Sequence, residues 1–258
     1  MTREETLGKI LYRGLVPILL QDDLPAMDCL EQVVSLGMEA VEISCRRTGV
    51  LRLITQAKQR FPQLAIGAAA LLDDGPLRDH MNATGTTIPS VAQAVDAGAD
   101  FLVSMLPFRE PIYESYRDTH IIVPACSTPG EGHQALDWGA NLLKFFNPQI
   151  HGGPAFFKVT DAITYGAFPF FTTGTARFEL LPGYVAAGVL VCGAGFDIIL
   201  GPDYRPMQRA FDEEYVIEGL NRFLRPVERS RRLHFEDVPF ESKDARAIGR
   251  ATGRCLNI

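Results

Sequence analysis

The segment "ALDWGANLLKFF" (135–146) contains the unit from which the fold is inferred. An apolar helical tail leads to Gly139, and a short apolar run follows this glycine. Glycine just past a helix end adopts the left-handed turn at little steric cost, so Gly139 marks the end of a helix. An uninterrupted apolar run is typical of a strand that is buried on both faces of a parallel sheet. The segment therefore predicts a helix followed by a parallel strand.

The same pattern recurs along the chain. It is found in "VVSLGMEAVEIS" (33–44), "AVDAGADFLVS" (94–104) and "YVAAGVLVCGAG" (184–195). Further apolar runs lie at 15–20, 63–71, 120–125 and 168–174. Eight strands that alternate with helices indicate an α/β protein with a (β/α)8 TIM barrel. A doubly wound sheet is the alternative, because the number of strands does not by itself close a barrel.

Two regions fit this repeat poorly. Residues 73–88 are too long for a simple connection and are expected to form a loop over the strand ends, either a binding loop or a solvated insertion. At the other end of the chain, we expect the last helix to stop near Pro226. We therefore assign 1–226 to the barrel with an N-terminal helix, and 227–258 to an extension that packs on the barrel or on a neighbouring subunit.

Net charge, the first residues and the cysteines indicate which partners and which cellular compartment to expect. The chain has 258 residues and a net charge of −6, which favours neither nucleic acid nor an anionic membrane as a partner. The charged start "MTREETLGKILYRG" (1–14) predicts no secretory signal, and no apolar stretch is long enough for a membrane span. The five cysteines are scattered and odd in number, which is typical of reduced thiols in a cytoplasmic protein.

One charge interrupts the quoted segment, because Lys144 has two large apolar residues on each side. Alternate residues of a strand face opposite sides, so Lys144 inside the barrel requires Leu142 and Phe146 to face inward as well. Apolar walls lower the pKa of an amine, and a neutral amine can attack a ketone to form a Schiff base. The alternative is a structural lysine whose stem is buried and whose head reaches solvent at the strand end.

A second polar cluster lies in "AVEISCRR" (40–47). Strand alternation places Glu42, Ser44 and Arg46 on one face. A carboxylate that enters the barrel from a different strand than Lys144 can move protons on and off a substrate. Arg46, nearer the C-terminal mouth, can bind a substrate carboxylate with two hydrogen bonds. The alternative is a structural ion pair between Glu42 and Arg46.

The two clusters resemble segments of the bacterial 2-keto-3-deoxy-6-phosphogluconate (KDPG) and 4-hydroxy-2-oxoglutarate aldolases. "VEISCRR" is similar to the family's E-V-T-L-R, and "LLKFFNPQIHGG" to its F-K-F-F-P-A-E-x-x-G-G. Three further segments also resemble family segments in the same order: "AIGAAALLDD", "DFLVSML" and "VPACSTPGE". The similarity in order and spacing extends over residues 13–200.

The resemblance implies a (β/α)8 barrel, usually trimeric, and Schiff-base aldolase chemistry without metal or organic cofactor. It implies that Lys144 forms the Schiff base, that Glu42 is the general acid/base and that Arg46 holds the carboxylate of the pyruvyl group. Thr173 in "FFTTGTA" matches the threonine of the family's P-T-G-G and would line the substrate site. The implied substrate is a 4-hydroxy-2-keto acid, which is cleaved to pyruvate and an aldehyde or formed from them.

The resemblance also implies a phosphate site on the backbone N–H groups of two glycine loops. Gly174 belongs to the first loop. The second loop offers Gly193, Ala194 and Gly195. Exposed N–H groups suit an anion, although a G-x-G sequence is also typical of a tight strand-to-helix turn. Thr175 replaces the second glycine of the first loop, and Asp197 would repel a dianion unless it faces away. A carboxylate or hydroxyl tail is therefore an alternative to phosphate.

Other departures leave two further functions open. The family's Gly-Thr, Pro-Gly and proline after K-F-F are replaced by Ala69-Ala70, Met105-Leu106 and Asn147. The changes at the Gly-Thr, Pro-Gly and second-glycine positions favour, as one alternative, an aldolase-derived ligand-binding protein with weak or no turnover. A sugar-phosphate isomerase or epimerase on the same fold is the other, since it needs a base but no imine. The five histidines show no metal-ligand spacing, so we expect no metal site.

Overall fold

The computed structural model describes residues 1–174, 177–201 and 211–258, so Thr175 lies outside the described residues. The strands are β1 (Leu15–Leu19), β2 (Ala40–Ser44), β3 (Ala65–Leu71), β4 (Phe101–Ser104), β5 (Ile121–Val123), β6 (Ala125–Cys126), β7 (Leu143–Phe146), β8 (Phe170–Thr173) and β9 (Val191–Gly195). All recorded pairings between them are parallel, in the order β5-β4-β3-β2-β1-β9-β8-β7-β6.

The sheet closes through one interrupted strand. Only Pro124 separates β5, which pairs with β4, from β6, which pairs with β7. The Pro124 carbonyl accepts a hydrogen bond of 3.0 Å from the Lys144 backbone N–H, so the ladder continues across the proline. Counting β5 and β6 as one strand, the nine segments make eight strands in a ring. The predicted (β/α)8 barrel is confirmed, and the doubly wound alternative is wrong because the sheet has no open edges.

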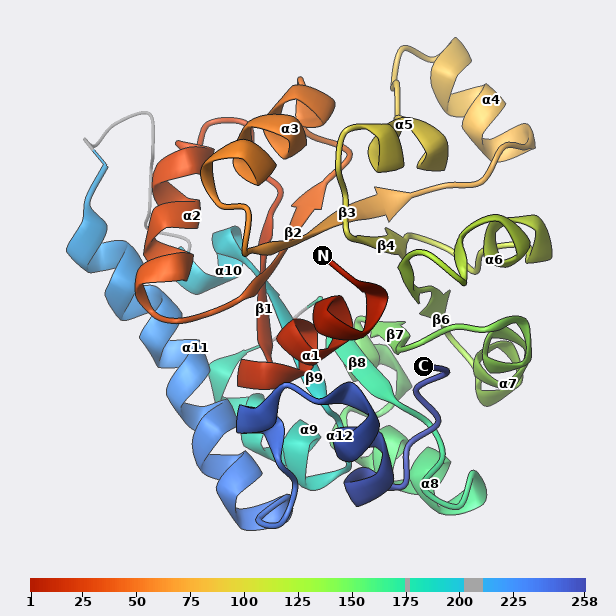
Figure 1. The fold of residues 1–258 in the computed structure, drawn as a ribbon, viewed down its shortest axis with the longest axis vertical. Helices are drawn as coiled ribbons and strands as arrows, with labels where there is room; N and C mark the ends of the chain where they lie inside the picture. The colour runs from red at the N-terminus through yellow and green to blue at the C-terminus, as the bar shows by residue number, and fades with distance from the viewer. Residues whose placement is uncertain (175–176, 202–210) are drawn as a thin grey trace.

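Helices surround the barrel (Figure 1). They are α1 (Arg3–Arg13), α2 (Ala26–Ser35), α3 (Val50–Arg60), α4 (Pro76–Ala83), α5 (Val91–Asp96), α6 (Glu110–Tyr116), α7 (Pro129–Trp138), α8 (Pro154–Ile163), α9 (Leu181–Ala186), α10 (Phe196–Leu200), α11 (Glu213–His234) and α12 (Ala245–Thr252), with 3-10 turns η1 (Pro148–His151), η2 (Phe178–Leu180) and η4 (Phe240–Ser242). Within these residues, no helix has the length and apolar character that crossing a membrane requires.

The quoted repeat unit folds as its residues predict. Helix α7 starts at a capping box in which Thr128 and Glu131 satisfy each other's backbone N–H groups. It ends at Gly139, whose φ of 111° is left-handed. In the strand that follows, Leu143 and Phe145 pack in the outer core, between sheet and helices. Leu142 packs in a separate core inside the barrel. The expected alternation of β7 is therefore present.

The C-terminal end differs from the sequence expectation. Helix α11 passes through Pro226 and continues to His234, so a helix stop near Pro226 is wrong. The reason is that the buried face continues beyond the proline, through Phe223, Val227 and Arg231. Spacings of four residues keep these side chains on one face of the helix. Their burial stabilises the helix although Pro226 has no backbone N–H group to donate.

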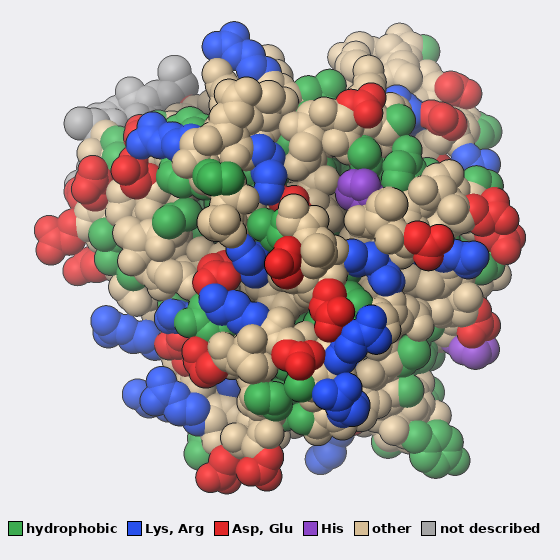
Figure 2. Space-filling view, in the orientation of Figure 1, with side chains coloured by type: hydrophobic (Ala, Val, Ile, Leu, Met, Phe, Trp, Pro, Cys, Tyr) green, Lys and Arg blue, Asp and Glu red, His purple; other side chains and the backbone are tan. Residues whose placement is uncertain are grey.

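The residues after α11 cover the N-terminal mouth of the barrel. Both η4 and α12 contact α1, and Figure 1 shows the red α1 beside the blue α12. Apolar residues of the extension share the inner core with α1: Phe240, Ala245, Ile248 and Leu256. Acidic and basic side chains are interspersed over the face that these segments present (Figure 2). The extension thus packs on its own barrel, and contact with a neighbouring subunit stays a prediction.

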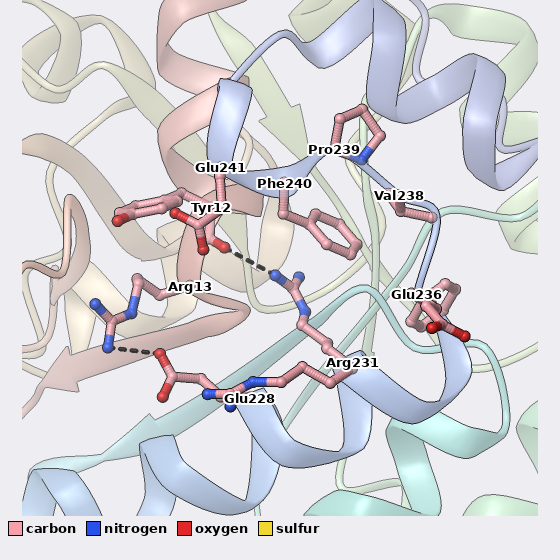
Figure 3. A pocket seen from close by; sticks show the side chains of 11 residues that line it. Tyr12, Arg13, Glu228, Arg231, Glu236, Val238, Pro239, Phe240 and Glu241 are labelled. Atoms are coloured by element: carbon pink, nitrogen blue, oxygen red, sulfur yellow. Dashed lines mark hydrogen bonds and ion pairs between the residues drawn. The ribbon is translucent and has the colours of Figure 1, made fainter.

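A buried arginine holds this closure together (Figure 3). Arg231 donates hydrogen bonds of 2.7 and 2.9 Å to the carbonyls of Leu11 and Tyr12, and another to that of Leu190. Its guanidinium lies 3.8 Å from the centre of the Phe240 ring. A cavity of about 240 Å³ lies beside it. One side chain therefore connects α1, the start of β9, α11 and the C-terminal extension.

The long connection after β3 is not a simple loop. It contains α4, none of whose residues is buried. The backbone N–H of Arg109 donates a hydrogen bond of 2.7 Å to the Asp73 carboxylate, and this bond ties the connection to the one after β4. The expected loop is therefore replaced by an exposed helix beside the C-terminal mouth, because Pro76 at the first turn and a helix-compatible sequence favour a helical segment there.

Candidate active site

A cavity of about 560 Å³ opens at the C-terminal mouth of the barrel. Six of the predicted site residues line it: Glu42, Arg46, Lys144, Thr173, Gly174 and Gly195. The other two do not. A Cβ placed on Gly193 would lie 2.9 Å from the Phe171 ring, so this glycine faces packed side chains inside the barrel. Ala194 is buried in the outer core. The turn therefore brings only the last residue of the G-A-G sequence to the cavity.

Glu42 and Lys144 face each other across the barrel. Glu42 is in register with Ile18 and Gly67 of its neighbours, and Lys144 with Ala125 and Phe171. In the ring of eight strands, β2 and β7 are separated by three strands on either side. They are therefore diametrically opposite, and side chains that point inward from them converge on the same space.

Both groups are buried. The exposed fraction is 1% for Glu42 and 6% for Lys144. Burial raises the pKa of Glu42 to about 7, although the Lys144 charge acts in the opposite direction. Burial also lowers the pKa of Lys144, and Arg46 adds to this effect while Glu42 opposes it. In both groups the cost of removing a charge from water exceeds the attraction between the two charges.

The pair is also poor in hydrogen bonds. Oε1 of Glu42 is buried and has no hydrogen-bond partner within the described residues. A buried, unpartnered carboxylate oxygen costs free energy, so its presence in a cavity indicates a place for a ligand or water. An amine with a lowered pKa facing a carboxylate with a raised one can exchange protons near neutral pH. This chemistry suits addition of the amine to a carbonyl group.

Arg46 lies at the rim of the cavity. It follows β2 and is exposed, and its backbone N–H donates a hydrogen bond of 3.3 Å to Oγ of Ser44. The structure shows no ion pair between Glu42 and Arg46, so the structural ion-pair interpretation is not supported for these two residues. The neighbouring Arg47 is buried instead and donates hydrogen bonds to the carbonyls of Gln21 and Leu24. The two arginines thus have different environments, and only Arg46 faces the cavity.

The ends of β7 and β8 meet at a tight approach that needs glycine. Thr173 ends β8 and is buried beside the cavity. Gly174 has a φ of 76°, and a Cβ there would lie 2.9 Å from the Phe146 ring. The Thr173 carbonyl accepts a hydrogen bond of 2.7 Å from the backbone N–H of Asn147. Asn147, at φ 50°, makes the turn where the family has proline.

Several wall residues were not predicted as site residues. Ile18 of β1, Leu20 directly after β1 and Ile198 of α10 line the cavity. The signal for the first two was strand alternation, because Val16 lies in the inner core and residues 18 and 20 share its face. Ala69 and Ala70 both line the cavity. The register with β4 shifts next to them, and Ala70 has a φ of 60°, which alternation does not predict.

No group of three or more histidine, cysteine, aspartate or glutamate side chains is arranged to hold a metal ion among the residues that the structure describes. All five cysteines are free, and Cys45, directly after β2, is buried in the outer core. The charged groups of the described cavity wall are Glu42, Arg46, Lys144 and Asp197.

Comparison with known proteins agrees with this geometry. The family model for KDPG and KHG aldolase, where KHG stands for 4-hydroxy-2-oxoglutarate, matches residues 9–202. The 2-dehydro-3-deoxy-phosphogluconate aldolase of Treponema pallidum (strain Nichols) is 27% identical over 174 residues, or 66% of this chain and 75% of that protein. The 2-dehydro-3-deoxy-6-phosphogalactonate aldolase of Escherichia coli (strain K12) is 26% identical over 190 residues, or 73% and 82% of the two chains.

Solved structures share the fold. A KDPG aldolase from Legionella pneumophila superimposes with a TM-score of 0.65 at 17% identity, and the match covers 85% of this chain and 96% of that one. The family model accounts for well over half of the sequence, including the strands that carry Glu42 and Lys144. This chain therefore belongs to the KDPG and KHG aldolase family of carbon–carbon lyases.

Proposed function

We propose that this protein is a Schiff-base aldolase that cleaves a 4-hydroxy-2-keto acid into pyruvate and an aldehyde, or forms it from them. The observation that carries the proposal is the buried, hydrogen-bond-poor pair of Lys144 and Glu42 on opposite strands of one barrel. In the proposal Arg46 binds the carboxylate of the keto acid, and Thr173 lines the pyruvyl part of the site. Gly174 and Gly195 contribute backbone to the far part of the cavity.

Lys144 begins the reaction. Its neutral amine adds to the C2 carbonyl of the keto acid, and a proton moves to the oxygen to give a carbinolamine. Loss of water then gives an iminium. Burial favours this sequence because it lowers the pKa of Lys144, so a larger fraction of the amine is unprotonated at neutral pH. In the KDPG aldolase from Legionella pneumophila, pyruvate was captured as a covalent carbinolamine, which supports the same first step here.

Glu42 moves the protons. As a carboxylate it takes the proton of the C4 hydroxyl, directly or through a water molecule, while the C3–C4 bond breaks. The bonding electrons move into the iminium to give an enamine, and the aldehyde is released. Glu42 then returns a proton to C3, and hydrolysis of the iminium releases pyruvate and the free amine. A pKa of about 7 suits both halves of this cycle, because the group is nearly as good an acid as a base at neutral pH.

The test is reductive trapping on the intact protein. Incubation with pyruvate and borohydride, followed by peptide mass spectrometry, should place one reduced pyruvyl group on Lys144. Lys144→Arg is the control, since it keeps the charge but cannot form the imine. A folded protein that gains no adduct would exclude the proposal. An adduct without turnover of any hydroxylated keto acid would instead favour the ligand-binding alternative, and activity retained in Lys144→Arg would favour an isomerase or epimerase.

We also infer that the protein works in the cytoplasm as a homo-oligomer, with a trimer as the expected form. An exposed apolar face supports the oligomer: Val159 and Ile163, four residues apart on α8, are 63% and 61% exposed, and nearby Tyr165 is 96% exposed. Apolar faces of this kind often mark subunit contacts. Light scattering of the purified protein measures the mass directly, and a monomer at micromolar concentration would contradict the inference.

A further inference from the structure

The cavity has a second part, beyond the Lys144–Glu42 pair, in which one carboxylate stands out. Asp197 is the second residue of α10, directly after β9, and it lines the cavity. Its side chain folds back over the preceding turn. A Cβ placed on Gly195 would lie only 2.1 Å from Oδ1 of Asp197 and 3.0 Å from Cδ2 of Leu20. The carboxylate therefore covers the backbone of Gly195 on the side where a Cβ would project.

The contact is with the flexible end of an exposed side chain, so it does not by itself require glycine at position 195. A larger residue at 195 would displace the Asp197 side chain. The backbone of the turn is consequently occupied by a negative charge that belongs to the protein. A phosphate that approached the same backbone would be close to this carboxylate, and the two like charges would repel each other.

Among the residues that the structure describes, the other charges of the cavity wall have different roles from that of Asp197. Among the described lining residues, Lys144 and Glu42 serve the chemistry and Arg46 serves the keto-acid carboxylate. The described outer wall is otherwise mostly apolar, with Leu20, Met105, Leu106, Phe146 and Ile198. A carboxylate accepts hydrogen bonds and cannot donate them when ionised, so it favours a hydroxyl group on the substrate and disfavours a second anion.

We propose that Asp197 determines substrate specificity, selecting a keto acid whose aldehyde half ends in a hydroxyl group and discriminating against its phosphorylated counterpart. The inference rests on the proposed aldolase function and adds the class of aldehyde. Asp197 also favours the start of α10 electrostatically, as an acidic residue in a first helical turn does. A purely structural role of this kind would change stability without changing the preference between two substrates.

The experiment compares two aldehydes that differ only in the phosphate. The kcat/KM for condensation with pyruvate is measured for D-glyceraldehyde and for D-glyceraldehyde 3-phosphate. We expect the wild-type protein to prefer the unphosphorylated aldehyde, and Asp197→Asn and Asp197→Ser each to shift the ratio towards the phosphorylated one by about tenfold or more. Inorganic phosphate should also inhibit both variants more strongly than it inhibits the wild type.

A matched control removes the same charge from the same end of the barrel. Asp23, in the connection between β1 and α2, is exposed and does not line the cavity. Asp197 is exposed as well, but it lines the cavity, whereas Asp23 does not. Asp23→Asn should therefore leave the substrate ratio within about twofold of wild type, because solvent screens its charge before it reaches the substrate. A similar shift in this control would assign the effect to overall charge and would overturn the role of Asp197.

Two other results would overturn the inference while leaving the aldolase function intact. One is a wild-type protein that prefers the phosphorylated aldehyde, a measurement that requires no variant. The other is an unchanged ratio in both Asp197 variants, each of which still forms the borohydride-trapped pyruvate adduct. Failure of the wild type to form the adduct would remove the proposed function and this inference together, so the two failures are distinguishable.

Discussion

Each of the two mouths of the barrel buries a basic side chain, but the two side chains differ in their hydrogen bonds. At the N-terminal mouth, Arg231 is 5% exposed and donates hydrogen bonds to three backbone carbonyls while it stacks on Phe240. At the C-terminal mouth, Lys144 is 6% exposed, and the structure shows no hydrogen bond from its Nζ to a described residue. Its opposing carboxylate, Glu42, also has an oxygen without a partner.

The difference separates a stabilising site from a reactive one. Burying a charge is costly, and hydrogen bonds of good geometry offset much of that cost. The two terminal nitrogens of Arg231 have such bonds, while its Nε has no partner among the described residues. Its charge therefore holds segments together that are far apart in the chain. Burial lowers the pKa of Arg231 as well, to about 9, but this value leaves the guanidinium charged at neutral pH. Lys144 and Glu42 lack such bonds, and burial shifts the pKa of each towards neutral pH, as acid–base and imine chemistry require.

Removing the amine at the C-terminal mouth should abolish turnover without harming the fold. Lys144→Met keeps most of the side-chain volume and removes the buried charge. We expect kcat for aldol cleavage to fall by about 10³-fold or more, since no imine can form. The free energy of unfolding should stay the same or rise by about 1 kcal/mol, because an apolar side chain replaces a poorly satisfied ion. A strong loss of stability would show that Lys144 is structural and would weaken the contrast with Arg231.

Removing the guanidinium at the N-terminal mouth should have the opposite result. In Arg231→Met the carbonyls of Leu11, Tyr12 and Leu190 lose their donors in a buried setting. We expect a loss of about 3–5 kcal/mol in the free energy of unfolding, measured by urea denaturation. The pyruvate adduct should still form in the folded fraction. The control is Arg232→Met on the same helix, where the side chain is exposed, and a comparable loss there would contradict the special role of Arg231.

The carboxylate of the reactive site should make stability depend on pH. Burial raises the pKa of Glu42 from an ordinary value of 4.5 to about 7, so the native state holds this proton more tightly than the unfolded chain. Its contribution to stability is therefore complete below pH 4.5 and is lost as the pH rises through about 7. Relative to Glu42→Gln, the wild type should lose about 1–3 kcal/mol across this window.

The same ionisation should appear in the kinetics. If Glu42 must be ionised to take a proton, kcat/KM should rise with pH up to about 7 in the wild type. The exposed Glu114, changed to glutamine, serves as the control for both measurements. An identical pH dependence of stability in wild type and Glu42→Gln would show that the buried carboxylate does not titrate in this range.

Backbone strain at the reactive mouth should have a weaker effect on stability than these buried charges. Ala70 has a left-handed φ of 60°, a conformation that costs a non-glycine residue about 1–2 kcal/mol. Ala70→Gly should relieve part of this strain and raise the free energy of unfolding by about 0.5–1 kcal/mol, because the greater freedom of glycine in the unfolded chain offsets the rest. Ala69→Gly is the control, since Ala69 is not among the residues of positive φ, and it should be destabilising. A loss of stability in Ala70→Gly would mean that its methyl group contributes more by packing than the strain costs.

Local patterns in the chain were enough to predict the barrel class and the catalytic candidates. The helix end at Gly139 and the alternation around Lys144 both follow from short-range geometry, namely the steric freedom of glycine and the two-residue period of a strand. The same period placed Glu42 on the inward face of β2. These features depend on residues a few positions apart, which is why they are visible without the fold.

Features that depend on distant segments were decided only by the tertiary structure. Pro124 interrupts one strand without opening the ring, because β4 and β7 pair with the two halves. Glu42 opposes Lys144 because eight strands place β2 and β7 at opposite positions, and α11 continues past Pro226 because its buried face does. Each outcome is set by packing between elements far apart in the chain, and neither residue propensities nor local periodicity contain that information.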